Sequence, residues 1–179
     1  MYRVVLTGGP GAGKTTLLRE LAALGYVTVE ESARAIIAER LAVELPRRPD
    51  PLTFAREILA RDIEKYVGQS HAAKWVFYDR GVIEALGMVQ EVSPLSAQEL
   101  AAMLATYPFH SSVFVLPPWE AIYTTDSERD QSFVDAVNVH AKIVQRYRSC
   151  GYVLHEVPCL PSQQRAQYVL QILTRSSVA

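Results

Sequence analysis

Residues 8–15 read Gly-Gly-Pro-Gly-Ala-Gly-Lys-Thr, and this segment constrains the fold more than any other part of the chain. It follows a short β-branched run, Tyr2–Thr7, and opens a segment whose leucines have helical spacing, Thr15–Leu24. The pattern G-x-x-x-x-G-K-[ST] between a strand and a helix is typical of a phosphate-binding loop, or P-loop. Glycines let the backbone N–H groups approach phosphate oxygens, and the start of the helix adds its positive dipole end. The sequence therefore predicts a nucleoside triphosphate site.

Each residue of the predicted loop has an expected role. We expect Lys14 to reach the β- and γ-phosphates and the Thr15 hydroxyl to ligate Mg²⁺. The other contacts to the nucleotide are expected from the rest of the loop and the next residue of the helix: Gly8, Gly9, Pro10, Gly11, Ala12, Gly13 and Thr16. ATP is the expected nucleotide, and GTP stays open as an alternative.

Strand-like and helix-like segments alternate along the rest of the chain. Further strands are predicted at Tyr26–Val29, Trp75–Tyr78, Ser111–Leu116 and Tyr152–Val157. Further helices are predicted at Ser32–Leu45, Leu52–Val67, Val82–Gln90, Ser96–Ala105, Gln131–Arg148 and Ser162–Leu173. This alternation favours an α/β fold in which helices cover both faces of a parallel sheet. We expect residues 1–179 to form a single domain of this kind.

Acidic residues follow two of the predicted strands, at the edge where open α/β sheets bind ligands. Asp79 directly follows Trp75–Tyr78 and is the candidate for a second Mg²⁺ ligand. Arg80 comes next, where its charge can hold an acceptor or neutralise a transferring group. Glu30 and Glu31 follow the second strand, and we choose Glu31 as the acid that accepts a proton from an acceptor hydroxyl. A helix cap at Asp79, an ion pair at Arg80 and exposed glutamates remain the structural alternatives.

The composition excludes several classes of protein. The chain has 18 Lys and Arg against 19 Asp and Glu, a net charge of −1, whereas nucleic-acid-binding domains are typically basic. No apolar run reaches the roughly 20 residues needed to span a membrane. Cys150 and Cys159 do not suggest a disulfide framework, and the N-terminus lacks a secretory apolar segment. We therefore expect a cytoplasmic protein that binds neither nucleic acid nor membranes.

The order of the motifs resembles the bacterial "AAA domain" family of small P-loop proteins, which is related to nucleotide and nucleoside kinases. The resemblance spans nearly the whole chain and rests on Val5–Leu17, Glu31–Ile37, Phe77–Gly81, Pro117–Trp119, Asp126–Arg129, Gly151-Tyr152, Val157-Pro158 and Arg165. Only the P-loop is specific by itself. The resemblance implies a P-loop NTPase fold with a five-stranded parallel sheet in the order 2-3-1-4-5.

Deoxynucleoside and thymidylate kinases combine a P-loop with a carboxylate after the second strand and an Asp/Glu-Arg pair after the third. Glu31 and Asp79-Arg80 match this pattern, which implies that an acid handles the acceptor hydroxyl and the arginine steadies the substrate. Such kinases often carry several arginines in a lid after the fourth strand. The corresponding segment here, 117–130, has only Arg129. We expect Arg129 to stabilise transition-state charge, with an ion pair to a neighbouring acid as the alternative.

These features predict an ATP- and Mg²⁺-dependent phosphotransferase that acts on a small hydroxyl- or phosphate-bearing acceptor, such as a nucleoside or nucleotide. Two other functions stay open. An NTPase switch that reports to a protein partner would have no acid-lined acceptor pocket. A nucleotide-binding module would hold ATP and Mg²⁺ without turning the nucleotide over.

Overall fold

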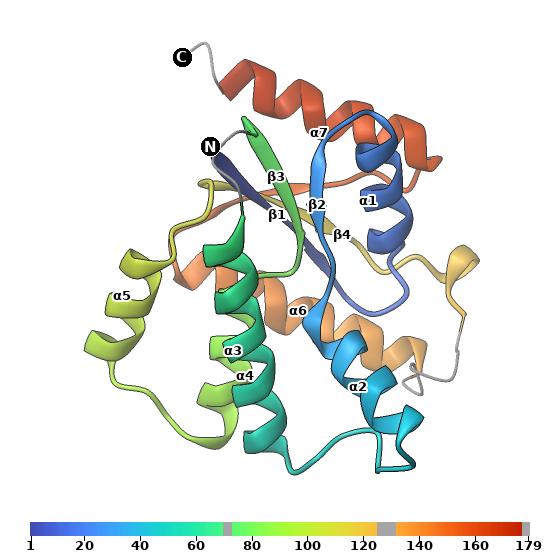
Figure 1. Ribbon diagram of the computed structural model, residues 1–179. Helices are drawn as coiled ribbons and strands as arrows, with labels where there is room; N and C mark the ends of the chain where they lie inside the picture. The colour runs from blue at the N-terminus through green and yellow to red at the C-terminus, as the bar shows by residue number, and fades with distance from the viewer. Residues whose placement is uncertain (70–72, 125–131, 177–179) are drawn as a thin grey trace.

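A five-stranded parallel sheet in the order β2-β3-β1-β4-β5 forms the centre of the computed structural model (Figure 1). The structure describes residues 1–69, 73–124 and 132–176. The strands are β1 (Tyr2–Gly8), β2 (Val27–Val29), β3 (Trp75–Asp79), β4 (Ser112–Leu116) and β5 (Val153–Glu156). All five predicted strands are present, with ends within one residue of those expected. The strand order implied by the family resemblance is also confirmed.

The helices also follow the predicted pattern. They are α1 (Lys14–Ala23), α2 (Ser32–Ala42), α3 (Pro51–Gly68), α4 (Val82–Val92), α5 (Ala97–Thr106), α6 (Phe133–Ser149), α7 (Ser162–Ser176) and a 3₁₀ turn, η1 (Glu120–Ile122). Helix α2 ends three residues earlier than predicted, because Glu44 adopts a left-handed backbone with φ of 57° before Pro46. None of the described helices combines the length and apolarity needed to cross a membrane.

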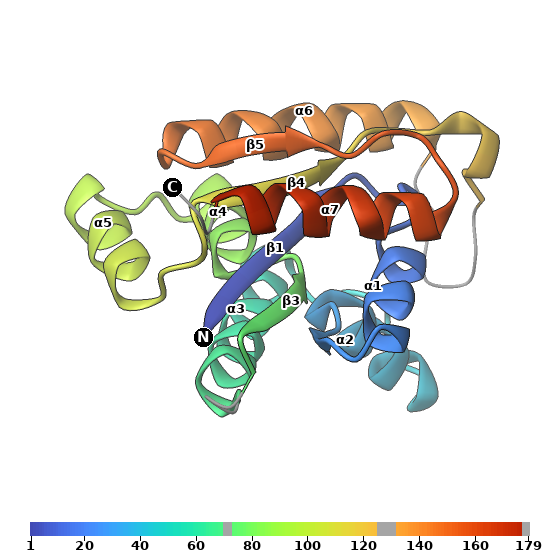
Figure 2. The same cartoon turned by 90° about the horizontal axis from the view of Figure 1, so that it is seen from above.

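Side chains of alternate strand residues build two separate parts of the core, as the pleat of a strand requires. Val4 and Leu6 of β1 belong to the part that contains residues of α1 and α7. Val5 belongs to the part that contains residues of α4 and α6. Figure 2 shows α1 and α7 together beside the sheet, with α3 and α4 on the other side. Helices therefore cover both faces.

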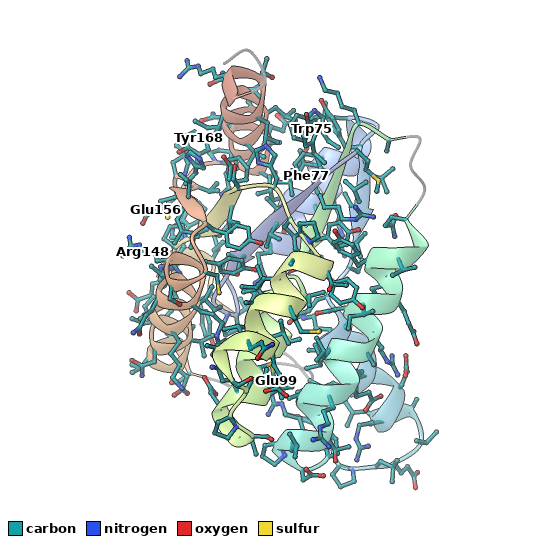
Figure 3. All side chains as sticks on the ribbon, turned by 90° about the vertical axis from the view of Figure 1, so that its left-hand side faces the viewer. Trp75, Phe77, Glu99, Arg148, Glu156 and Tyr168 are labelled. Atoms are coloured by element: carbon teal, nitrogen blue, oxygen red, sulfur yellow. The ribbon has the colours of Figure 1, made fainter. Side chains whose placement is uncertain are left out.

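The view with all side chains separates the interior from the surface. Phe77 on β3 lies inside and is completely buried, whereas Glu99 on α5 and Arg148 on α6 are exposed (Figure 3). Three helix starts carry side-chain caps: Asp50 accepts from Thr53 N at 3.0 Å, and Ser96 and Ser132 cap α5 and α6. Ser96 and Glu99 form a capping box at the start of α5.

The register of the parallel strands positions the site. Leu6 pairs with Asp79, and Gly8 pairs with Leu116. The end of β1 therefore lies between the ends of β3 and β4, and the P-loop leaves the sheet beside Asp79. Because β2 pairs with β3 in the same direction, its end is placed at the same edge. Residues far apart in the sequence meet there.

Leu6 gives a direct test of this central packing. It is completely buried in the core part between the sheet and helices α1 and α7. We expect Leu6→Ala to lower the free energy of unfolding by about 3 kcal/mol, measured by urea denaturation, because it leaves a cavity that its neighbours cannot fill. Leu24→Ala is the control, because Leu24 is 58% exposed, and it should change stability by about 0.5 kcal/mol or less. Equal effects would contradict this account of the core.

Candidate active site

The P-loop and the ends of β2 and β3 line one cavity of about 920 Å³. Nine of the predicted site residues line it: Pro10, Gly11, Gly13, Lys14, Thr15, Thr16, Glu31, Asp79 and Arg80. Gly8, Gly9 and Ala12 are buried and do not line it. Arg129 lies outside the described residues, so its predicted role stays a prediction. The cavity extends from the P-loop to side chains of α2, α3 and α4.

Two glycines allow the P-loop to take its shape. Gly11 and Gly13 have φ values of 78° and 84°, in the left-handed region that favours glycine. A Cβ at Gly11 would collide with the ring of Tyr123, and one at Gly13 would lie 2.9 Å from Arg165 Nη1. The loop is therefore held between α7 and the beginning of the segment predicted as a lid. The described part of that segment, 117–124, contains η1 and packs against the loop.

Lys14 is the first residue of α1, and its side chain is 6% exposed. Its Nζ donates hydrogen bonds to the carbonyl oxygens of Gly8 at 3.2 Å and Gly9 at 3.1 Å. Burial and the charge of Arg80 lower the pKa of Lys14, while nearby carboxylates oppose this shift. The ammonium group is thus held inside the loop, where an anionic ligand would gain from its charge.

Asp79 is the last residue of β3 and is 7% exposed. Its Oδ1 is buried and has no hydrogen-bond partner within the described part of the chain. Burial raises the pKa of Asp79 to about 6, although the charge of Lys14 lowers it. A buried carboxylate oxygen without a partner is costly in free energy, so it points to a ligand that the cavity would hold.

Arg80 has an unusual backbone conformation that aims its side chain at two carboxylates. Its φ is 69°, which costs about 1 kcal/mol for a residue other than glycine. The Arg80 N–H donates to Leu6 O at 3.0 Å. Its Nε donates to Glu31 Oε1 at 2.9 Å, and its Nη1 lies 3.8 Å from Glu84 Oε1. Burial by itself lowers the pKa of Arg80, but the surrounding carboxylates raise it by more than burial lowers it. The guanidinium therefore stays charged.

Glu31 lies at the start of α2, but its side chain makes no capping hydrogen bond. Its carboxylate faces Arg80 in the cavity. Burial raises its pKa, but the charges of Arg80 and Lys14 outweigh this effect and lower it. Glu30 is exposed and does not line the cavity. Of the two acids after β2, the structure thus brings Glu31, and not Glu30, to the P-loop.

Glu84 is a buried site residue that the sequence analysis missed. It is 4% exposed, accepts a hydrogen bond from Thr7 Oγ1, and accepts one from Gly81 N at 3.3 Å. Burial raises its pKa. Its sequence signal is a single charge inside an apolar helix, Val-Ile-Glu-Ala-Leu-Gly-Met-Val. Glu84 is thus a second carboxylate beside Arg80, in addition to Glu31.

Arg165 joins the last helix to the P-loop. Its Nη1 donates to Ala12 O at 3.1 Å, and its Nε donates to Leu160 O at 2.7 Å. Its guanidinium carbon lies 4.6 Å from the centroid of the Trp119 ring. Trp119 and Arg165 both line the cavity on the side of the P-loop. This stacked pair offers a flat surface beside the loop that is suited to a nucleobase.

Ser32 and Asp62 were not singled out from the sequence, yet both line the cavity beyond Glu31. Ser32 Oγ donates to Asp62 Oδ1 at 2.5 Å and joins α2 to α3. Burial raises the pKa of Asp62 to about 6. The alternation of charges along α3 hides which acid faces inward, so the sequence carried no signal for this pair.

Other charged residues of the sequence are distributed as follows. Arg34, Lys142 and Arg146 line the cavity, and the latter two lie 3.6 Å and 3.2 Å from Glu91 Oε1. Arg61 pairs with Glu39 outside it. Among the described residues, no three His, Cys, Asp or Glu side chains form a cluster that could hold a metal by themselves. Both cysteines are free thiols, as expected.

Comparisons with solved structures give the same fold. Shikimate kinase from Acinetobacter baumannii in complex with shikimate is 17% identical, with a TM-score of 0.65, and the match covers 100% of this chain and 96% of the shikimate kinase chain. Deoxyadenosine kinase from M. mycoides with bound dATP is 14% identical, with a TM-score of 0.59, over 96% and 99%. Thymidylate kinase from Ehrlichia chaffeensis is 16% identical, with a TM-score of 0.60, over 97% and 99%.

A search of curated proteins finds no significant match. The match to a family model shows the family of this chain, whereas the similarity to solved structures shows its fold alone. Residues 3–165 match the AAA domain family, and this range contains the P-loop, Glu31, the Asp79-Arg80 pair and Arg165. The match covers most of the chain and agrees with the P-loop kinase fold of the solved structures. The chain therefore belongs to the AAA domain family of P-loop proteins.

Proposed function

We propose that the protein is a phosphotransferase that moves the γ-phosphoryl group of ATP to a hydroxyl group of a small acceptor. The observation that carries this proposal is the acid-lined second half of the cavity. Beyond the P-loop, the cavity continues along Glu31, Ser32, Asp62 and Glu84. An NTPase that only hydrolyses its nucleotide has no need of this half. The three kinases of the same fold support the proposal by analogy.

The nucleotide half of the site follows from the loop. Lys14 and the backbone N–H groups of the loop bind the phosphates. Trp119 and Arg165, stacked at 4.6 Å, support the base on the same side. Because Lys14 is buried and its hydrogen bonds go to loop carbonyls, it can turn to the phosphates without leaving the cavity.

The residues present suit a magnesium ion. Mg²⁺ in kinases is commonly held by one or two protein oxygens together with phosphate oxygens and water. Asp79 has a buried oxygen without a protein partner in the described chain, and Thr15 lines the same cavity. These two residues would hold the ion, which when bound neutralises negative charge on the phosphates.

The transfer is an in-line displacement at the γ-phosphorus. The acceptor oxygen forms a bond to phosphorus while the bond to the β–γ bridging oxygen breaks, so ADP leaves. The Glu31 carboxylate takes the proton of the acceptor hydroxyl. Arg80, held by Glu31 at 2.9 Å and near Glu84, stabilises the transferring charge. Because this chemistry needs little covalent participation by the protein, catalysis comes from positioning and electrostatics.

The experiment that tests the function is ³¹P NMR of the purified protein with ATP, Mg²⁺ and pooled nucleosides, nucleotides, sugars and vitamin precursors. A new phosphoester signal in one pool is the expected result. Inorganic phosphate alone in every pool would favour an NTPase switch, and intact ATP would favour a binding module. Either outcome would contradict the proposed transfer.

Lys14→Ala tests the nucleotide half of the site. Removing the buried ammonium group should weaken ATP binding by at least about 10-fold and abolish turnover, because a charge-assisted contact to phosphate is lost. Calorimetric titration measures affinity, and circular dichroism verifies folding. Lys74→Ala is the control, because Lys74 is exposed and does not line the cavity. Unchanged turnover of folded Lys14→Ala would overturn the P-loop assignment.

Glu31→Gln tests the proposed proton acceptor. The amide cannot take a proton, so the transfer rate should fall by about 100-fold or more while ATP affinity changes little. Single-turnover kinetics and ATP titration separate the two effects. The neighbouring Glu30→Gln, at an exposed acid outside the cavity, should behave like the unmodified protein. An equal loss of binding and transfer in Glu31→Gln would show that Glu31 is structural.

Asp79→Asn tests the link between the ion site and stability. Burial raises the pKa of Asp79 to about 6, so the folded protein binds this proton more tightly than the unfolded chain. The ionised carboxylate therefore destabilises the fold above pH 6, and this cost disappears as the pH falls toward 4. Asp79→Asn should be more stable than the unmodified protein by about 2 kcal/mol at pH 7, with the difference shrinking toward pH 4.5.

Urea denaturation at the two pH values measures this difference. The same variant should bind ATP with less help from Mg²⁺, because the neutral amide is a weaker ligand for the ion. Lower stability of Asp79→Asn at pH 7 would contradict the view that the carboxylate is poised for a ligand.

A further inference from the structure

The Ser32–Asp62 pair has a hydrogen-bonding arrangement that limits what it can bind. Ser32 is 1% exposed and donates its only hydroxyl proton to Asp62 Oδ1 at 2.5 Å. The lone pairs of Ser32 Oγ and of the Asp62 carboxylate remain as acceptors. Within the described chain, no other side chain hydrogen-bonds to the Asp62 carboxylate. The pair thus offers acceptors and no free donor.

The cationic side chains near Ser32 and Asp62 donate their hydrogen bonds to other groups. Lys65, one turn further along α3, donates from Nζ to Glu30 O at 2.7 Å. Arg80 donates to Glu31 and approaches Glu84. The pair therefore presents negative charge and lone pairs to the cavity. A phosphate group, which offers only acceptors and negative charge at neutral pH, would be repelled there.

An apolar wall adjoins this polar pair. Ile37, Phe54 and Ile58 are buried, pack together with Ala85, and line the cavity. They come from α2 and α3, the same two helices that carry Ser32 and Asp62. A ligand seated here meets apolar carbon on one side and hydrogen-bond acceptors on the other, which suits the carbon skeleton and hydroxyl groups of a ring polyol.

We propose that Ser32 and Asp62 bind a second hydroxyl group of the phosphoryl acceptor, next to the hydroxyl that is phosphorylated at Glu31. Ser32 directly follows Glu31 in the sequence and both line the same cavity, so the two hydroxyl groups belong to one small molecule. The part of the acceptor that lies against this pair is then an uncharged carbon skeleton with a hydroxyl group, and not a phosphate group. This inference rests on the proposed function and names the chemical group of the acceptor that Ser32 and Asp62 recognise.

The same chemistry occurs in the sugar of a ribonucleoside and in a free cyclic polyol. The test therefore uses defined compounds of both kinds: adenosine, guanosine, cytidine and uridine, their 2′- and 3′-deoxy counterparts, and myo-inositol. Each compound is incubated with ATP and Mg²⁺, and ADP, phosphate and the phosphorylated product are followed separately.

Asp62→Asn is the informative variant, because its amide oxygen can still accept from Ser32 while its NH₂ group replaces an acceptor with a donor. For the best polyol, we expect KM to rise by about 10-fold and kcat to change by less than about 3-fold, as for the loss of one hydrogen bond to a charged group. For the matching deoxy compound, which lacks the recognised hydroxyl, the variant should leave KM unchanged. KM for ATP should also stay constant.

Glu64→Gln is the matched control, because Glu64 lies two residues further along α3, is exposed and does not line the cavity. Thermal unfolding of each variant verifies its fold. An equal rise of KM for polyol and deoxy compound in Asp62→Asn would overturn the inference while leaving the transferase function in place. Inorganic phosphate or intact ATP with every compound would overturn the proposed function and this inference together.

Discussion

The mutual compensation of buried charges at the carboxyl edge of the sheet is the constraint on which the site depends. Lys14, Glu31, Asp79, Arg80 and Glu84 come from the P-loop helix, the ends of β2 and β3, and α4. Each of them would be costly to bury alone, because an ion loses its hydration in the interior. Three carboxylates face two cations, so the cluster has an excess of one negative charge. A divalent cation reverses this excess.

The strained backbone of Arg80 follows from the same constraint. A left-handed φ of 69° is tolerated because it turns the guanidinium between Glu31 and Glu84, where two carboxylates hold it. A relaxed backbone would aim the side chain elsewhere and leave both acids without the Arg80 guanidinium. Local strain of about 1 kcal/mol is small beside the cost of an uncompensated buried carboxylate. The contacts of Arg80 with both acids are therefore formed without a ligand.

The strands and the P-loop could be read from the sequence because their signals are local. Short apolar runs mark the strands, and the glycines with Lys14 and Thr15 mark the loop. Glu31 and Asp79-Arg80 were found because acids at strand ends meet at one edge of a parallel sheet. The strand order could be predicted only from the family resemblance, because the sequence by itself does not show which strands pair.

The remaining site residues depend on helix packing, which single residues do not reveal. Asp62 lies among other charges on α3, and only the position of α2 brings Ser32 to it at 2.5 Å. Glu84 had a readable signal, a charge in an apolar helix, yet its partner Thr7 lies 77 residues away in the sequence. Arg165 could be identified only through the family resemblance, because the residue that it contacts, Ala12, lies 153 residues away in the sequence.

The contact between Arg165 and Ala12, which are 153 residues apart in the sequence, has a consequence for folding during synthesis. The P-loop is synthesised first, but its backbone at Ala12 is held from α7, and β1 pairs with β3 and β4 on its two sides. A nascent chain on the ribosome therefore cannot assemble a finished nucleotide site until residue 165 has emerged. Until then, the Ala12 carbonyl lacks the Arg165 contact that holds the loop, and before β3 and β4 emerge both edges of β1 are unpaired, a state that favours aggregation.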